Sequence, residues 1–263
     1  DSYKALVAES SDRGMAAQLR DGEYDFAGQN IFDGGLSRGQ DVGSLRVIGA
    51  MGGTTVFSNI GSAHYSGTVF SRDIHYKDCV QPIYLTGLIE NVDIELNEFS
   101  GNRRSIYHND NAAGAEVKAG SIAKNHFHDH AEADFLGCVL FNRAPVSRNI
   151  TVKENRFERL NPLSGNILII CQVGTDTSTV LDNFSNNKFN DNVITECGEN
   201  IFTFSGSASF GCILNGIDNE QHNNVIYDNY WFEPLYCKGD GNSQLTNKLR
   251  NNQHSGVSMK VVA

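Results

Sequence analysis

The stretch Ile122-Ala-Lys-Asn125-His-Phe127 carries a six-residue template: an apolar residue, two variable residues, Asn, one variable residue and an aromatic. The same template occupies residues 94–99, 152–157, 184–189 and 226–231. A degenerate copy at residues 74–79 has Lys and Cys in the Asn and aromatic places. The last position recurs at intervals of 20, 28, 30, 32 and 42 residues, which is typical of a repeat with inserted loops of variable length.

Each unit also contains a second apolar run rich in β-forming residues, beginning at residues 83, 105, 138, 167, 201 and 235. These runs are too short for helices and are bounded by Asn, Gly and Asp, so they predict strands. Strands stacked turn upon turn would place like positions ~4.8 Å apart. We therefore expect a hydrogen-bonded column of Asn97, Asn125, Asn155, Asn187 and Asn229. Beside it we expect the inward-facing rings of Phe99, Phe127, Phe157, Phe189 and Trp231.

The composition agrees with a chain of many tight turns. There are 28 Asn and 26 Gly but only 4 Pro, and Asn and Gly both tolerate left-handed backbone. Six cysteines have no CxxC pair and no zinc-ligand spacing: Cys79, Cys138, Cys171, Cys197, Cys212 and Cys237. Several lie in apolar runs, so we expect buried free thiols and assembly in a reducing cytoplasm.

The chain is expected to form one domain, residues 1–263. Residues 1–44 would be an N-terminal cap, residues 45–240 the stacked turns and residues 241–263 the C-terminal end. The best helix candidate is residues 13–20, which would cap the open end of the stack. Residues 21–24 predict a turn and then a strand, and residues 45–57 predict two strands around a Gly-rich turn. Because the chain opens without Met or a secretory leader, we expect a fragment of a longer protein.

The chain resembles the right-handed parallel β-helix of the pectin-lyase-like superfamily. The resemblance rests on the expected capping helix, the segments 19–24 and 48–57, and the Asn-aromatic units. The resemblance covers roughly residues 13 to 240. Within the superfamily the chain is most similar to bacteriophage tailspike depolymerases, with free thiols, variable loops and no leader. The resemblance implies an all-β fold, a polysaccharide substrate, a homotrimer and a location in the virion tail or outside the cell. No catalytic motif of the superfamily matches residue by residue.

Charge and hydropathy limit the other partners. The formal net charge of −10 disfavours binding to nucleic-acid phosphates over the whole surface. No apolar run approaches the length of a membrane span. We expect neither nucleic acid nor membrane as a partner, and no cofactor.

Two loops carry the acids that are candidates for glycoside hydrolysis. Asp134 and Glu132 precede the run at Cys138, and Glu199 and Glu196 precede the run at residue 201 two units later. Neighbouring turns lie ~5 Å apart and alternate turns ~10 Å apart. Retaining hydrolases need carboxyl groups ~5 to 5.5 Å apart and inverting hydrolases ~6.5 to 9.5 Å apart, so the spacing of the turns brackets both mechanisms. Asp134 and Glu199 are therefore the leading acid and base, with Glu132 and Glu196 as alternates. Asp110, one turn earlier, is a third candidate. The alternative for all of them is a solvated acidic loop.

A second set suggests a lyase or epimerase acting on a uronate polymer. His108 or Tyr107 would remove a proton while Arg143 neutralises the uronate carboxylate. His126, His128 and His130 alternate along the chain but specify no fourth ligand, so we expect surface or substrate-contact histidines and no metal site.

Sugar binding is expected from Tyr84, Tyr107 and Tyr236, with Arg103 and Arg104 beside them, because tyrosine combines an apolar ring with a polar tip. Inward packing of these rings is the alternative. The leading functional prediction is thus a phage-tailspike glycoside hydrolase that cleaves a bacterial capsule or O-antigen. The alternatives are the lyase or epimerase and a non-catalytic receptor-binding module or adhesin.

Overall fold

A computed structural model provides the structure of the chain. It describes residues 16–29, 44–108, 114–130, 137–141, 145–160, 169–174, 181–197, 209–215, 218–227, 232–238 and 248–254. In these ranges the chain is all-β, with parallel pairing throughout and one short 3-10 helix, η1 (Leu181–Phe184). No helix in the described ranges is long and apolar enough to cross a membrane.

The larger sheet has sixteen strands within the described residues and consists of two limbs. Two long strands, β5 (Ser62–Arg72) and β7 (Gln81–Glu95), run through both limbs. The first limb continues from their first halves through β9 (Arg104–His108), β13 (Gly137–Phe141), β17 (Ile169–Val173), β20 (Ser209–Asn215) and β23 (Phe232–Lys238).

The second limb contains the second halves of β5 and β7. Its other strands are β1 (Ala17–Gln18), β3 (Leu45–Ile48), β11 (Gly120–Ala123), β15 (Ile150–Lys153), β18 (Lys188–Asn190), β21 (Glu220–His222) and β24 (Lys248–Arg250). The short strands β10 (Glu116–Val117) and β14 (Val146–Ser147) extend the pairing ahead of β11 and β15.

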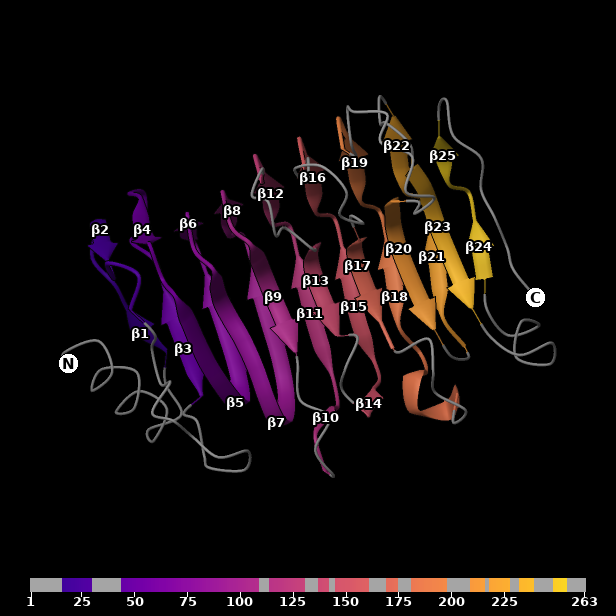
Figure 1. Ribbon diagram of the computed structural model, residues 1–263, viewed down its shortest axis with the longest axis horizontal. Helices are drawn as coiled ribbons and strands as arrows, with labels where there is room; N and C mark the ends of the chain where they lie inside the picture. The colour runs from indigo at the N-terminus through magenta and orange to yellow at the C-terminus, as the bar shows by residue number, and fades with distance from the viewer. Residues whose placement is uncertain are drawn as a thin grey trace.

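The smaller sheet has nine strands within the described residues. They are β2 (Gly22–Asp25), β4 (Thr55–Ser58), β6 (Ile74–Lys77), β8 (Glu98–Ser100), β12 (His126–His128), β16 (Arg156–Glu158), β19 (Val193–Thr195), β22 (Val225–Tyr227) and β25 (Gln253–His254). From β7 onward the chain passes from the first limb to the second limb, then to the smaller sheet and back to the first limb. Each such circuit pairs with the circuits before and after it, and the circuits follow one another along the long axis of Figure 1.

The aromatic column of the template is confirmed over three units. Phe99, Phe127 and Phe157 are in register in β8, β12 and β16, and all three are fully buried. Their ring centroids lie 4.7 and 4.9 Å apart with nearly parallel planes. Tyr76 of β6 extends the stack by one circuit, 5.0 Å from Phe99. The spacing of the strands thus sets the spacing of the rings.

The Asn column is confirmed for Asn97, Asn125 and Asn155, each buried at the bend before the smaller sheet. The Asn125 Oδ1 accepts hydrogen bonds from the backbone N–H and Nδ2 of Asn97, at 2.9 and 3.2 Å. In the same way, the Asn155 Oδ1 accepts hydrogen bonds from the backbone N–H and Nδ2 of Asn125. The residue before each Asn has positive φ, near 55°. A left-handed residue followed by Asn therefore turns the chain, and the Asn side chain satisfies the backbone donor of the bend one circuit earlier.

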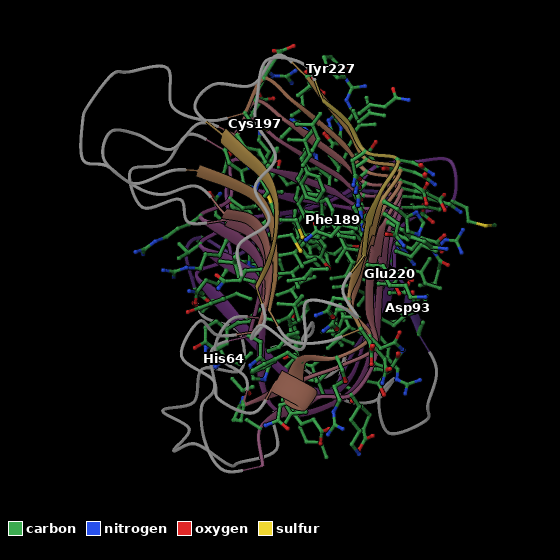
Figure 2. All side chains as sticks on the ribbon, turned by 90° about the vertical axis from the view of Figure 1, so that its right-hand side faces the viewer. His64, Asp93, Phe189, Cys197, Glu220 and Tyr227 are labelled. Atoms are coloured by element: carbon green, nitrogen blue, oxygen red, sulfur yellow. The ribbon has the colours of Figure 1, made fainter. Side chains whose placement is uncertain are left out.

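The expected position of Asn187 in this column is wrong. The column continues from Asn155 to Asn192, Asn224 and Asn252 through the same hydrogen bonds. Asn187 lies at a different bend, before β18, where its Oδ1 accepts from the backbone N–H of Ile150. Phe189 is buried as expected but is in register with Val152 of the second limb. Figure 2 shows Phe189 in the interior between the sheets.

The physical reason for this error is that both bends use the same local sequence. A left-handed residue, Asn, one outward residue and one inward residue occur at residues 154–157 and again at 186–189. A six-residue template therefore cannot tell the two bends apart. The degenerate copy at residues 74–79 is misaligned similarly, since Tyr76 rather than Cys79 pairs with Phe99. Asn229 and Trp231 lie outside the described residues.

The N-terminal helix is also a wrong expectation for the residues that the structure describes. Ala17–Gln18 form β1 and pair in parallel with β3. Ala17 and Leu19 are buried while Gln18 and Arg20 are exposed, which is the period of two that a strand requires. The strands expected after residue 21 and around the Gly-rich turn are confirmed as β2, β3 and β4.

The expected burial of the cysteines is confirmed for five of them. Cys79, Cys138, Cys171, Cys197 and Cys212 are free and buried. Burial raises the pKa of Cys79 and of Cys197 to about 12, so both remain neutral thiols within the core. Cys237 belongs to β23, where the structure describes the backbone only.

Candidate functional site

Parallel register brings the three tyrosines expected to bind sugar to equivalent positions of the first limb, in one column. Parallel register aligns Tyr84 of β7 with Tyr107 of β9. The next positions are Leu140 of β13, Gln172 of β17, Ile213 of β20 and Tyr236 of β23. By register, Tyr236 shares the position of the other two tyrosines, four circuits from Tyr107. Arg104 is the first residue of β9, and Arg103 immediately precedes it.

The first members of this column pack against one another. The Tyr84 and Tyr107 ring centroids lie 5.4 Å apart with nearly perpendicular planes. The Arg104 guanidinium carbon lies 4.9 Å from the centre of the Tyr107 ring, a cation–π contact. His64 of β5, which is in register with Tyr84, stacks on it with centroids 4.3 Å apart and planes 18° apart.

Exposure varies along the column. His64, Tyr84 and Arg104 are partly exposed. Tyr107 is only 6% exposed, Leu140 2% and Gln172 6%, although all three occupy outward positions of their strands. Among the side chains of the column that the structure describes, the open part is therefore the N-terminal end, over β5, β7 and the start of β9. Figure 2 shows His64 on the outside of the molecule.

His108 does not share this surface with Tyr107. Adjacent residues of a strand point to opposite faces, and the His108 side chain is fully buried. Its Nε2 lies 3.4 Å from the carbonyl oxygen of Gly87. The structure therefore separates two members of the alternative lyase set. The third, Arg143, follows β13 and lies outside the described residues.

Most of the acidic candidates also lie outside the described residues: Glu132, Asp134, Asp110 and Glu199. The strands that flank them are described. Residues 131–136 lead into β13, and residues 198–208 lead into β20, with β17 paired between these two strands. The next described strands after the two segments, β13 and β20, are thus two circuits apart.

The strand that the sequence predicts at residue 201 lies outside the described residues. The next strand that the structure describes after Glu199 is β20, which begins at Ser209. Asp134 precedes β13 by only three residues. In sequence, Asp110 follows the C-terminal end of β9, whereas Asp134 precedes the N-terminal end of β13. Because β9 and β13 are parallel, these two strand ends lie at opposite edges of the first limb.

Glu196 is the one acidic candidate that the structure describes. It is exposed and adopts a left-handed φ of 54° at the bend after β19. Register places this bend next to those of Asp129 and Arg159 in the preceding circuits. Glu196 therefore belongs to a column of bend residues on the side of the smaller sheet.

The outer surface of the smaller sheet carries a charged network across four circuits. Its members are His75, Glu98, His126, His128, Asp129, Arg156, Glu158 and Arg159. His128 Nε2 lies 2.8 Å from Glu98 Oε1, and His126 Nε2 lies 3.2 Å from Glu158 Oε2. Arg159 binds both carboxylate oxygens of Asp129, at 2.6 and 3.0 Å.

The pKa shifts in this network favour ionised carboxylates. The hydrogen bond from Arg159 holds the pKa of Asp129 well below its usual range. Burial alone would raise the pKa of Glu158, but the His126 hydrogen bond and the charges of Arg156 and Arg159 lower it overall. General acid catalysis needs a carboxyl group that stays protonated. This network is therefore suited to holding neighbouring circuits together.

The three alternating histidines do not face one side. His126 and His128 lie on the outer surface with ring centroids 4.3 Å apart, while His130 is fully buried. The His130 Nδ1–H donates to the carbonyl oxygen of His128 at 2.8 Å, so its Nε2 accepts from the Ser105 hydroxyl at 2.9 Å. Burial lowers the pKa of His130 to about 4. Across the described ranges, no three His, Cys, Asp or Glu side chains are arranged to hold a metal ion.

Comparison with known proteins adds no family assignment. No protein-family model matches the chain, and no curated protein matches it with significant similarity.

The sequence patterns did not identify His64 as a neighbour of Tyr84, and they did not identify the charged network on the smaller sheet. The circuit of His64 precedes the first full copy of the Asn-aromatic template, so no motif marked its register with Tyr84. A signal did exist, because His64 occupies an outward position in the alternating run of residues 62–65.

Proposed function

We propose that this chain is a right-handed parallel β-helix of the pectin-lyase-like type that binds an extended polysaccharide on the outer surface of its first limb. The observation that carries the proposal is the in-register column of His64, Tyr84 and Tyr107, with Arg104 over Tyr107. Aromatic rings with polar tips and guanidinium donors suit a hydroxyl-rich polymer. A column with one position per circuit also suits a repeating chain.

The proposed activity is hydrolysis of a bacterial capsule or O-antigen, as in a phage tailspike, with Asp134 and Glu199 as acid and base. Support comes from the pairing of β13 and β20 on either side of β17, which makes the two acidic segments lead into strands two circuits apart. That separation, ~10 Å, is near the range for inversion. The burial of His108 weakens the elimination alternative. A homotrimer belongs to the same proposal and follows only from the resemblance.

The test is incubation of the protein with a panel of neutral and acidic capsular and O-antigen polysaccharides. Shortened saturated products support hydrolysis, whereas unsaturated uronate ends support elimination. Binding without shorter products makes the chain a receptor-binding module. Binding to none of the panel contradicts the proposal.

Variants then assign the acids. Asp134→Asn and Glu199→Gln should each lower turnover about 100-fold or more with little change in polymer binding. Glu132→Gln, Glu196→Gln and Asp110→Asn test the alternates. The matched control is Glu220→Gln in β21, because Glu220 lies on the outside of the second limb (Figure 2). Full activity in Asp134→Asn or in Glu199→Gln removes that residue from the mechanism.

A further inference from the structure

His128 of β12 has a carboxylate at each of its two ring nitrogens. Its Nε2 lies 2.8 Å from Glu98 Oε1, and its Nδ1 lies 2.7 Å from Asp129 Oδ2. An ionised carboxylate only accepts hydrogen bonds, whereas a neutral imidazole has one donor and one acceptor nitrogen. Both contacts are therefore hydrogen bonds only when both nitrogens of His128 carry a proton, which makes the ring a cation.

The Asp129 carboxylate is already occupied by another donor. Arg159 Nε donates to Asp129 Oδ1 at 2.6 Å, and Arg159 Nη2 donates to Asp129 Oδ2 at 3.0 Å. The hydrogen bond from Arg159 holds the pKa of Asp129 well below its usual range. Asp129 is therefore ionised at neutral pH, and the proton between Asp129 and His128 belongs to His128.

The other histidines around His128 have less need of a charge. His126 lies beside it on β12 with ring centroids 4.3 Å apart, and its Nε2 contacts one carboxylate, that of Glu158. A neutral imidazole is sufficient for that single contact. Burial lowers the pKa of His126 and of His75, and the charge of His128 lowers both further. The charged groups on the flanking strands are His75 and Lys77 of β6, Glu98 of β8, and Arg156 and Glu158 of β16.

We propose that His128 is a pH-sensitive latch of the smaller sheet. As a cation it joins Glu98 of the preceding circuit to Asp129, which Arg159 binds from the following circuit. Loss of one proton leaves a lone pair facing one of the two carboxylates, so that one attractive contact becomes repulsive. The stabilisation is therefore complete below about pH 6.5 and is lost as the pH rises. The proposal is independent of the polysaccharide site, because none of these residues belongs to the first limb.

Nitrogen NMR of the histidine side chains in the full chain tests the charge directly, with the His128 signals assigned by their loss in His128→Gln. At about pH 7 both ring nitrogens of His128 should carry a proton in the wild-type protein. Glu98→Gln supplies an amide that can donate to a neutral ring, so in this variant His128 should lose its proton at a lower pH. A neutral His128 in the wild-type protein at about pH 7 would overturn the proposal.

Denaturant titration measures the effect of the latch on stability. His128→Gln should raise the unfolding equilibrium constant about tenfold at about pH 6, and by a clearly smaller factor at about pH 9. The matched control is His126→Gln, because His126 lies on the same face of the same strand. Its effect should be similar at the two pH values, since the amide of Gln can still donate to Glu158. An effect of His128→Gln that is equal at both pH values, or larger at the higher one, would contradict the latch.

Discussion

Two columns of aromatic rings run across neighbouring circuits of this molecule, one inside and one outside. In the inner column, Phe99, Phe127 and Phe157 stack in parallel at 4.7 to 4.9 Å and are fully buried. In the outer column, His64 and Tyr84 are parallel at 4.3 Å, but Tyr107 turns to 85°. The same strand spacing thus gives a closed stack in the core and an interrupted, partly exposed one on the surface.

The difference follows from what surrounds each ring. A phenylalanine enclosed by two sheets has only its neighbours to contact, so it takes the spacing of the strands. The outer rings carry polar atoms and border on solvent, and Arg104 contacts the face of Tyr107. The inner column should therefore control stability, and the outer column should control binding.

The strongest test of the comparison is truncation of the inner column. Phe157→Ala removes a ring packed 4.9 Å from Phe127 and 6.1 Å from Phe189. It should lower the free energy of unfolding by about 3 to 5 kcal/mol, because the cavity lies between two sheets. Denaturant titration measures the change. A loss below ~0.5 kcal/mol would place this ring on the surface.

The dependence of the free energy of unfolding on pH tests whether buried His130 stays neutral in the folded state. Burial lowers the pKa of His130 to about 4. In the unfolded chain this histidine binds a proton near pH 6.5, whereas in the folded chain it stays neutral down to about pH 4. Stability should therefore fall as the pH drops from about 6.5 to 4, by roughly 3 kcal/mol from this residue. His75 and His126, whose pKa values burial also lowers, act in the same direction.

The matched variant for this titration is His130→Leu combined with Ser105→Ala. Leucine is compatible with the position, since Leu160 is buried at the corresponding place one circuit later. The double variant should show a shallower acid slope than wild type. An unchanged slope would mean that His130 is protonated in the folded state.

The Asn column offers an intermediate effect. Asn155→Ala removes the acceptor of the backbone N–H of Asn125, one of the two acceptors of its Nδ2, and the side-chain donor to the carbonyl oxygen of Ile122. The expected loss is about 1 to 3 kcal/mol, because these groups remain buried. Asn91→Ala, on an exposed position of β7, is the control and should change stability by less than ~0.5 kcal/mol. Equal effects of the two variants would contradict the ladder.

The smallest stability effect is expected in the outer column. Tyr84→Ala should cost about 1 kcal/mol or less, because the ring is partly exposed. Its effect on polysaccharide affinity should exceed its effect on unfolding. A loss comparable to that of Phe157→Ala would make Tyr84 a core residue and remove the contrast between the columns.

The sequence by itself determined the repeat, the all-β class and the burial of the thiols, because these depend on local chemistry. A left-handed residue, an Asn and an inward aromatic act within four positions of one another, and residues 96–99 and 124–127 show it directly. The same local chemistry explains the error at Asn187. Two bends of one circuit share this pattern, and only pairing between circuits shows that Asn192, not Asn187, follows Asn155.

Tertiary structure alone decided which side of a strand each candidate faces and which residues meet across circuits. The register of β9 with β7 places Ile106 beside Ile83, and both side chains are buried in the core. His108 lies two residues after Ile106 and therefore points to the same, inner face. Ala17–Gln18 form a strand because they pair in parallel with β3. His64 reaches Tyr84 only through the register of β5 with β7. Contacts between residues so distant in sequence depend on the stacking of whole circuits, which no local motif encodes.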